Sequence, residues 1–175
     1  MPSESIRRLL VNFILFQIGW FACLLIDSAW LYFIMAVILL VHFLWVVPKL
    51  KIFFELSLLI KVLFVGLCLE VFYLQLGVLV QANASSFPPV WLLFIWVLFA
   101  TTFAHSLLWL RNQLYVAAAF AAIAAPLSYY AGVQLNMSMS FHSNVLFSVG
   151  MIAVSWAIVF PLVLRWVLPN VTSPS

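Results

Sequence analysis

The sequence predicts an all-α polytopic membrane protein, a bundle of six transmembrane helices that forms a single domain over residues 1–175. Hydrophobic residues make up 68% of the 175 positions and charged residues only 6%, whereas a soluble domain carries about 25% charged residues. The apolar residues fall into six long segments, and a helix that crosses the hydrocarbon core needs about 20 of them. With so few polar side chains, the chain is not expected to cover a water-facing surface.

Each of the six apolar segments is long enough to form a helix of this kind. Prolines and clusters of polar residues interrupt helices. Each apolar segment is separated from the next by a proline, by a polar cluster or by both. Every connection is too short to contain a soluble catalytic domain, so any function must be carried by the helices and their loops. In chain order, the predicted helices cover residues 9–26, 29–47, 52–80, 90–110, 114–135 and 144–168.

The connections predict how neighbouring helices are arranged. Asp27-Ser28 is a turn so short that the first two helices must form an antiparallel hairpin. The segment 48–51, which begins with a proline, and Arg111-Asn112-Gln113 are tight turns after the second and fourth helices. The polar segments 81–89 and 136–143 are longer loops, which we expect on the opposite side of the membrane.

The basic residues predict the orientation of the bundle. Loops next to spanning helices keep their Lys and Arg in the cytoplasm, and six of the seven Lys and Arg lie at one set of helix ends. Both termini are therefore expected in the cytoplasm. The net charge of +3 comes without a basic cluster beside exposed aromatic residues, so no nucleic-acid partner is expected. The six residues are Arg7, Arg8, Lys49, Lys51, Arg111 and Arg165.

The fifth predicted helix consists mostly of small residues. Segment 117–125 contains seven alanines and is followed by Pro126. Small side chains let neighbouring helices approach closely. We therefore expect this helix to be central, with neighbours on several sides, and to be kinked at the proline.

The third predicted helix carries three ionisable residues, Glu55, Lys61 and Glu70. Such residues are costly in hydrocarbon and mark candidate functional positions. The segment is longer than a straight span requires, so two registers are open: Lys61 near the middle of the membrane, or Lys61 at the inner interface with Glu70 toward the midplane. A tilted intermediate is favoured, with Glu70 buried in protein in either case.

Glu70 lies on a helix face with Gly66 and Tyr73. Gly66 leaves a gap on this face, Glu70 supplies a carboxyl group and Tyr73 a phenol. This combination is compatible with a proton-handling or substrate-binding site. It is equally compatible with a neutral carboxyl group that is hydrogen-bonded to a neighbouring helix.

A second group of polar residues is predicted in the cytoplasmic half of the bundle. Spacings of three and four place five of them on one broad face of the fourth helix, and three other helices add four more at similar depth. This pattern predicts an inward-facing polar pocket, although such residues also commonly bond helices to one another. In an enzyme, His105 would be the acid or base and Glu55 its orienting partner. The residues are Asn12, Gln17, His42, Glu55, Thr101, Thr102, His105, Ser106 and Trp109.

The sequence gives only a weak indication of a metal site. His42, His105 and Glu55 match the ligand set of a non-haem iron site, but they come from three helices without a local spacing signature. No cofactor is therefore expected. Cys23 and Cys68 are expected to be buried apolar residues, and a disulfide between them requires that their helices pack side by side.

Three segments occur in a fixed order: NFILFQIGWFAC at 12–23, ATTFAHSLLWL at 100–110 and APLSYYAG at 125–132. Together they resemble an uncharacterised family of small bacterial inner-membrane proteins, the domain of unknown function 2878. A familiar member has Gly in place of Ala125 and often Asp in place of Glu70. The resemblance implies a location in the bacterial inner membrane. Members look to be encoded beside lipid-modifying enzymes, which implies a link to membrane-lipid chemistry or oxidative stress. The resemblance transfers no catalytic residue.

Three hypotheses for function follow. The leading one is a protein that binds or processes a lipid-soluble molecule, as an accessory to fatty-acyl modification or the response to oxidative stress. Its partners would be membrane lipid, a lipid-modifying enzyme or a second copy of the chain. The first alternative is a small permease, proton-coupled through Glu70 and dimeric. The second is a structural or assembly subunit without a site. Whether the protein is an enzyme stays open.

Overall fold

The computed structural model describes residues 2–168, with side chains from Ile6 onward, and these residues form the predicted all-α fold. Four helical ranges are long and apolar enough to cross a membrane, namely Ile6–Leu25, Lys49–Gln75, Leu114–Leu135 and Val145–Val167. Two apolar helical ranges, Trp30–Val46 and Val90–Phe103, are shorter. The α-helices are α1 (Pro2–Leu25), α2 (Trp30–Val41), α3 (Ile52–Gln75), α4 (Val90–Phe103), α5 (Leu114–Leu135) and α6 (Val145–Val167).

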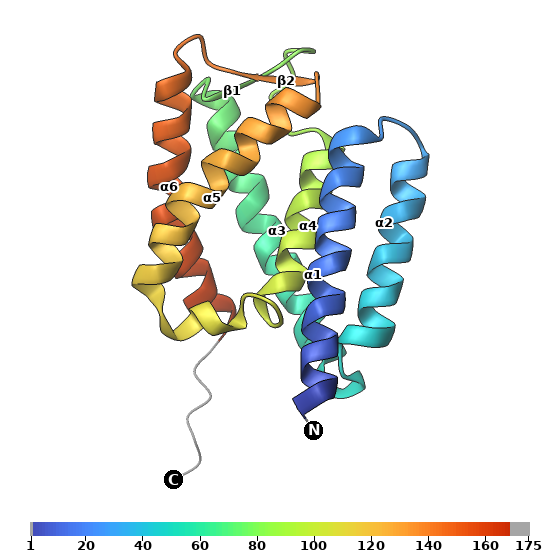
Figure 1. The fold of residues 1–175 in the computed structure, drawn as a ribbon. Coiled ribbons are helices and arrows are strands. Elements are labelled where there is room, and N and C mark those ends of the chain that lie inside the picture. The colour runs from blue at the N-terminus through green and yellow to red at the C-terminus, as the bar shows by residue number, and fades with distance from the viewer. Residues whose placement is uncertain (1, 169–175) are drawn as a thin grey trace.

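The helices form a bundle in which α4 is central (Figure 1). Both α1 and α3 pack against α4, α2 packs beside α1, and α5 packs extensively on α6. The start of α1 and the end of α6 lie at the same end of the bundle (Figure 1). The connections that carry Lys49, Lys51 and Arg111 are found at this end too.

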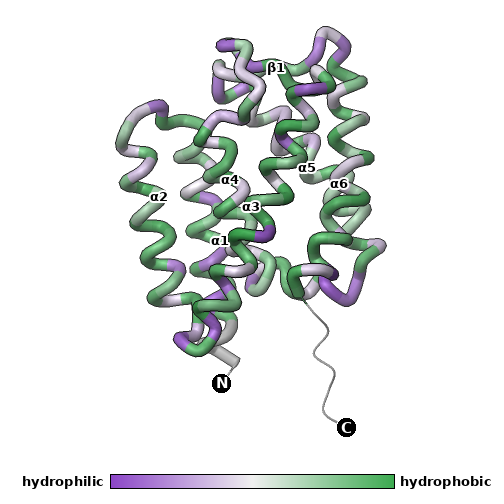
Figure 2. The backbone as a smooth tube through the Cα atoms, turned by 180° about the vertical axis from the view of Figure 1, so that it is seen from behind, coloured by the Kyte–Doolittle hydropathy of each residue, from purple (hydrophilic) through white to green (hydrophobic). Residues whose placement is uncertain are grey.

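The sides of the bundle are apolar. Figure 2 shows hydrophobic residues along the helices and most of the hydrophilic residues at the two ends. Large apolar side chains such as Ile60, Phe64 and Val154 are exposed on these sides. A contiguous apolar surface of this kind is stable when it contacts lipid rather than water.

The third helix is shorter than predicted, because α3 ends at Gln75 rather than at residue 80. Gly77 adopts a left-handed conformation with φ of 67°. The amide of Gly77 donates to the Leu74 carbonyl, and that of Val78 donates to the Tyr73 carbonyl. This is the Schellman arrangement that closes helices at a glycine.

Two short strands follow the ends of α3 and α5. β1 (Leu79–Gln81) pairs antiparallel with β2 (Met139–Phe141), and Val80 is opposite Ser140. The pair lies at the end of the bundle opposite the start of α1 (Figure 1). The two longer polar loops are thereby joined into one cap.

The fourth helix also ends early, so the continuous helix predicted over 90–110 is wrong beyond Phe103. The hydroxyls of Thr101 and Thr102 donate to the carbonyls of Leu98 and Phe99, each at 2.6 Å. Hydroxyls that bond to the preceding turn compete with the helical pattern. The chain then turns through residues 104–107 before a short 3₁₀ helix, η3 (Leu108–Asn112).

The second helix changes character near its end. After Val41 it continues as a π-helical turn, η1 (His42–Val46), and Pro48 precedes a single 3₁₀ turn, η2 (Lys49–Lys51). Inserted π turns of this kind are frequent at functional sites. The irregular segment formed by η1 and η2 lies beside the start of α3, at the basic end of the bundle.

The fifth helix is peripheral, which differs from the expectation that small residues would make it central. α5 packs mainly on α6, while Ile123 and Leu127 are exposed. The helix continues through Pro126 to Leu135. Its small residues serve another purpose, described below.

Candidate functional site

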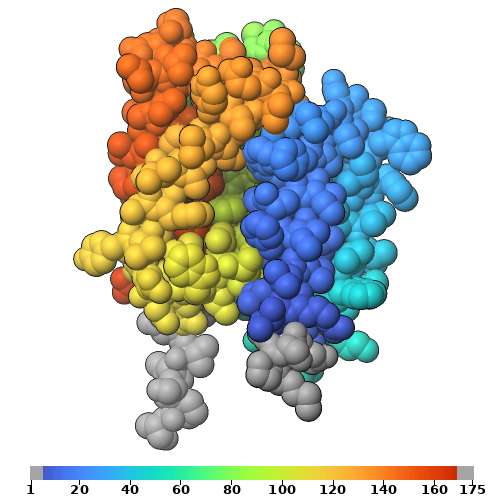
Figure 3. All heavy atoms as spheres, viewed as in Figure 1, coloured from blue at the N-terminus to red at the C-terminus, as the bar shows by residue number. Residues whose placement is uncertain are grey.

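A cavity of about 400 Å³ lies between α1, α4, α5 and α6. Figure 3 shows it as a hollow between α1, in blue, and α5, in yellow to orange, with atoms of α4 and α6 visible behind. The cavity is therefore open on the side of the bundle, where the surface is apolar. Its volume is within the range of about 300–1,000 Å³ that is typical of ligand sites.

The small residues of α5 create this space. Ala121, Ala124, Ser128 and Gly132 line the cavity from α5. Spacings of three and four put them on one face, and their short side chains leave a gap where larger ones would contact α1. Small residues also allow close approach, between α5 and α6 and at Gly19, where an added Cβ would be 2.6 Å from the Leu98 side chain.

Aromatic side chains form the opposite walls. α1 contributes Phe13, Phe16 and Trp20, and α4 contributes Trp96 and Phe99. One polar contact crosses from α1 to α5, because the Trp20 indole N–H donates to the Ser128 hydroxyl at 3.2 Å. Our sequence interpretation missed these aromatic residues. Their spacing of three and four along α1 was a usable signal, but in an apolar helix it does not differ from a lipid-facing stripe.

Some of the residues predicted to line a polar pocket do line this cavity. Gln17, Thr102 and Ser106 contribute to its wall. Asn12 and Thr101 are buried behind it. Asn12 accepts from the Ser106 hydroxyl at 2.8 Å and donates to the Thr101 carbonyl at 3.0 Å. Asn12 thus bonds α1 to the turn after α4.

Trp109, which was also expected to line the pocket, is exposed. It lies on η3, and 54% of its surface is accessible. The expectation assumed a continuous helix that would keep Trp109 on the same face as Thr102 and His105. The end of α4 at Phe103 removes that shared face, so the assignment of Trp109 was wrong.

Glu70 lies behind the cavity wall and is fully buried. One carboxyl oxygen accepts from the Trp96 indole N–H at 2.8 Å and from the Tyr129 hydroxyl. Trp96 occupies the gap expected beside Gly66, since a Cβ on that glycine would be 2.2 Å from the indole ring. Tyr73 bonds instead to Ser155 on α6. Glu70 therefore connects α3 to α4 and α5 without touching the cavity directly.

Lys61 lies toward the basic end of the bundle. Its ammonium nitrogen is 5.5 Å from the centroid of the Trp166 ring, in the last turn of α6. A cation over an indole face is stabilised electrostatically. Of the two registers left open by the sequence, this contact favours the one in which Lys61 lies at the interface over the one in which it lies near the middle of the membrane.

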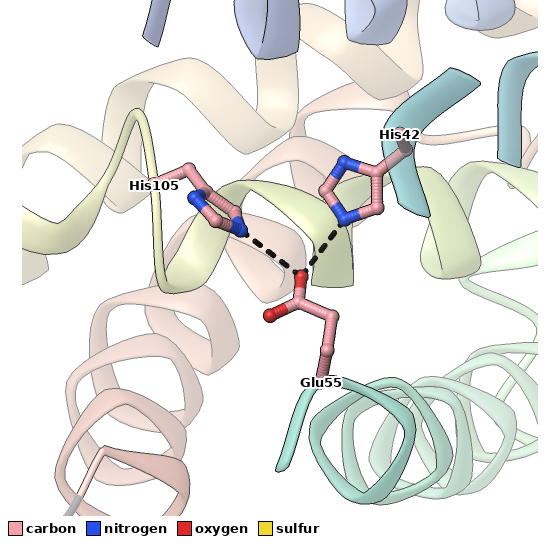
Figure 4. A group of neighbouring side chains, drawn as sticks. All are labelled: His42, Glu55 and His105. Atoms are coloured by element: carbon pink, nitrogen blue, oxygen red, sulfur yellow. Dashed lines mark hydrogen bonds and ion pairs between the residues drawn. The ribbon is translucent and has the colours of Figure 1, made fainter. Parts of the chain in front are cut away.

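His42, Glu55 and His105 form a second site, separate from the cavity (Figure 4). His42 begins the π turn η1, Glu55 lies in the first turn of α3, and His105 lies in the turn after α4. One Glu55 oxygen is 2.9 Å from His42 Nε2 and 3.3 Å from His105 Nε2. His42 and Glu55 are each 1% exposed, and the His105 side chain is 13% exposed.

The single polar pocket expected from the sequence is therefore two sites. Gln17, Thr102 and Ser106 belong to the cavity, whereas the three residues with acid–base or metal-binding chemistry converge elsewhere. The cysteines belong to neither site. Cys23 is buried against Met35, Cys68 is exposed, and the two are not paired.

Comparison with known proteins places the chain in a family. Residues 9–162 match the family model described as "Protein of unknown function (DUF2878)", so the chain belongs to this family. No curated protein matches the chain, and no solved structure does. The family's description names no activity, so inference about function rests on the cavity and on the cluster of two histidines and a glutamate.

Proposed function

We propose that this member of the DUF2878 family is a multi-pass protein of the bacterial inner membrane that binds a lipid-soluble molecule in the cavity between α1 and α5. The observation that carries the proposal is the cavity itself, with a volume of about 400 Å³ and a mostly apolar lining. An apolar ligand gains about 25 cal/mol for each Å² of apolar surface removed from water. A ligand already dissolved in lipid gains less, so close packing against aromatic walls must supply the rest.

The position of the cavity supports entry from the bilayer. It opens between two helices on the apolar side of the bundle (Figure 3). A molecule dissolved in the membrane can therefore enter sideways without crossing water. Aromatic rings such as Trp20 and Trp96 offer flat apolar faces to a hydrocarbon chain.

The distribution of polar groups favours an amphipathic ligand with one small polar group. Gln17, Thr102 and Ser106 lie in the wall formed by α1 and the end of α4. A polar head group placed here can form hydrogen bonds, while its chain extends along the aromatic part of the cavity. Ligand sites commonly combine an apolar lining with a few polar groups that fix orientation.

A photo-reactive palmitic acid analogue tests this proposal directly. After illumination of protein in lipid nanodiscs, we expect peptides that contain Phe13, Trp20 and Ala124 to carry the label. Ala124→Trp fills the cavity and should reduce labelling at Phe13 and Trp20 several-fold. The matched control is Ile123→Trp, because Ile123 is the adjacent residue, lies outside the cavity and is 65% exposed. Equal labelling in the two variants would contradict the proposal.

The role in lipid chemistry is tested in cells. If the bound molecule takes part in fatty-acyl modification, a deletion strain should show an altered lipid profile under oxidative stress, and the wild-type gene should restore it. Ala124→Trp should fail to restore the profile, whereas Ile123→Trp should succeed. Unchanged lipids in the deletion strain would exclude this role and favour the structural-subunit hypothesis.

A further inference from the structure

We propose that His42, Glu55 and His105 bind one divalent transition-metal ion. The inference is independent of the lipid site, because none of the three residues lines the cavity. Their ligand atoms, two imidazole nitrogens and a carboxylate oxygen, all lie within 4.8 Å of one another. Figure 4 shows both imidazole rings directed at the carboxylate from different elements.

The distances fit a common ion. A metal about 2.1 Å from each nitrogen and oxygen ligand separates neighbouring ligands by about 3.0–3.4 Å, for octahedral and tetrahedral geometry respectively. The two nitrogen–oxygen separations in the cluster are 2.9 and 3.3 Å. The two nitrogen–oxygen separations therefore match those around one ion, and side-chain rotations would have to bring the two imidazole nitrogens, which lie within 4.8 Å of each other, to a similar separation.

The backbone around the cluster is irregular in just the places that bring the ligands together. His42 begins a π turn, and His105 follows the early end of α4. Irregular backbone at membrane depth is tolerated where it is buried in protein, and it recurs at ion sites.

The cluster is poorly satisfied as a set of hydrogen bonds alone. His42 is almost fully buried, yet its Nδ1 atom has no hydrogen-bond partner among the described residues. His105 Nε2 is near the Glu55 oxygen but lacks hydrogen-bond geometry. His42 Nε2 already bonds to Glu55 at 2.9 Å, so the unused atom that bears on metal binding is His105 Nε2, which lies near the same carboxylate oxygen without a hydrogen bond. A metal ion would engage both Nε2 atoms and the carboxylate at once.

The ligand set selects the class of ion. Imidazole nitrogen suits Zn²⁺, Fe²⁺ and related ions, whereas Mg²⁺ and Ca²⁺ prefer oxygen ligands. Three protein ligands leave at least one coordination position open, as in catalytic rather than structural zinc sites. The His105 side chain is 13% exposed, so the cluster is not completely closed off from its surroundings.

The experiment uses the purified full chain in detergent, stripped of metal and then titrated with Co²⁺ and Zn²⁺. We expect one Co²⁺ per chain, a visible d–d absorption band, displacement by Zn²⁺ and no displacement by millimolar Mg²⁺. His42→Ala, His105→Ala and Glu55→Gln should each weaken Co²⁺ binding by more than the roughly 10- to 100-fold that loss of an outer-shell partner costs. Failure of the wild type to bind stoichiometric Co²⁺ or Zn²⁺ would overturn the proposal.

The chain offers matched controls for each change. His142→Ala removes the one other histidine, which lies in the loop at the opposite end, and Glu70→Gln changes the other buried glutamate. Neither should alter the affinity for Co²⁺ or its spectrum. Should a ligand variant fail to fold, X-ray absorption on the wild-type Zn²⁺ complex decides instead. Scattering from two imidazoles supports the site, and its absence overturns the proposal.

Discussion

At the scale of single residues, Gly66 determines how Glu70 is held. Because Gly66 has no side chain, the Trp96 indole can lie directly on α3. Its N–H then donates to the carboxyl group of Glu70, one helical turn further along. Glycine in a helix normally costs about 0.5–1 kcal/mol relative to alanine. Here that cost is offset by a buried hydrogen bond and by the stacking of Trp96 on Trp156, whose ring centroids are 5.1 Å apart.

Gly66→Ala should therefore destabilise the protein. A Cβ at this position would lie 2.2 Å from the rigid indole, and overpacking of this kind costs about 1–3 kcal/mol. The free energy of unfolding, measured in mixed micelles, should fall by that amount, and the tryptophan fluorescence should shift. Gly150→Ala is the control, since a Cβ there meets nothing within 4 Å. It should leave stability equal or higher, and equal losses in both variants would contradict the explanation.

At the scale of elements, the early end of α4 positions side chains for both sites. Residues 104–107 carry Ser106 into the cavity wall and His105 into the histidine–glutamate cluster. Asn12 on α1 holds this turn, because it accepts from the Ser106 hydroxyl at 2.8 Å and donates to the Thr101 carbonyl at 3.0 Å. The turn is thus bonded to α1 as well as to its own helix, where the amides of His105 and Leu107 donate to the Thr102 carbonyl.

A double-mutant cycle between Asn12→Ala and Ser106→Ala measures this bond. Residues in direct hydrogen-bond contact have coupling energies of about 0.5–3 kcal/mol, so the double variant should be less destabilised than the sum of the single ones. Free energies of unfolding supply the cycle. Asn12→Ala combined with Ser143→Ala, an exposed serine of the far loop, should be additive. Additivity in the first pair would show that Asn12 does not hold the turn.

The predictable and unpredictable parts of the elements differ in physical origin. The apolar segments could be located because burial in lipid requires long runs of apolar residues. α5 and α6 agree closely with prediction, whereas α1 begins at Pro2 rather than at residue 9. The end of α4 could not be predicted, because no proline or glycine marks it. Two threonine hydroxyls bonded to the preceding turn accompany the break instead. Where α4 ends therefore depends on tertiary partners such as Asn12.

The sites were predictable only in part, for a related reason. Their polar residues stand out in an apolar sequence, so Glu55, His42 and His105 were identified as candidates. Their separation from Gln17 and Ser106 depends on where α4 ends. The alanines of α5 were predicted to allow close packing, and α5 does pack extensively on α6, but Ala121 and Ala124 also border a cavity that was not predicted. Small residues permit either close packing or a cavity, and the outcome depends on how near the facing helix lies.

At the scale of the whole molecule, basic residues gather at one end of the bundle. Arg7, Arg8, Lys49, Lys51 and Arg111 lie near that end, as does Arg165 in the last turn of α6. The strand pair and the turn with Asp27 lie at the other end. The start of α1 and the end of α6 therefore lie at the same end of the bundle. Under the positive-inside rule, this arrangement agrees with the expectation from the sequence that this end of the bundle is cytoplasmic.

Reporter fusions test the proposed orientation. A green fluorescent protein at the C-terminus should fluoresce, because it folds in the cytoplasm, and alkaline phosphatase there should be inactive. Alkaline phosphatase inserted after Asn83, in the loop at the opposite end, should be active. Replacing both Lys49 and Lys51 by Gln should weaken the preference for this orientation. The C-terminal fluorescent protein should then lose part of its fluorescence, and the C-terminal phosphatase should gain partial activity. In the wild type, an active C-terminal phosphatase would show that the orientation is inverted.

The turn after α4 has one further consequence, because its neighbouring residues Ser106 and His105 belong to different sites. A lipid that shifts Ser106 displaces His105 through a single peptide unit. If binding of the lipid moves this turn, the two affinities are thermodynamically linked, and each ligand changes the other's dissociation constant by the same factor. A metal titration repeated with and without bound lipid would then report the coupling free energy between the two sites.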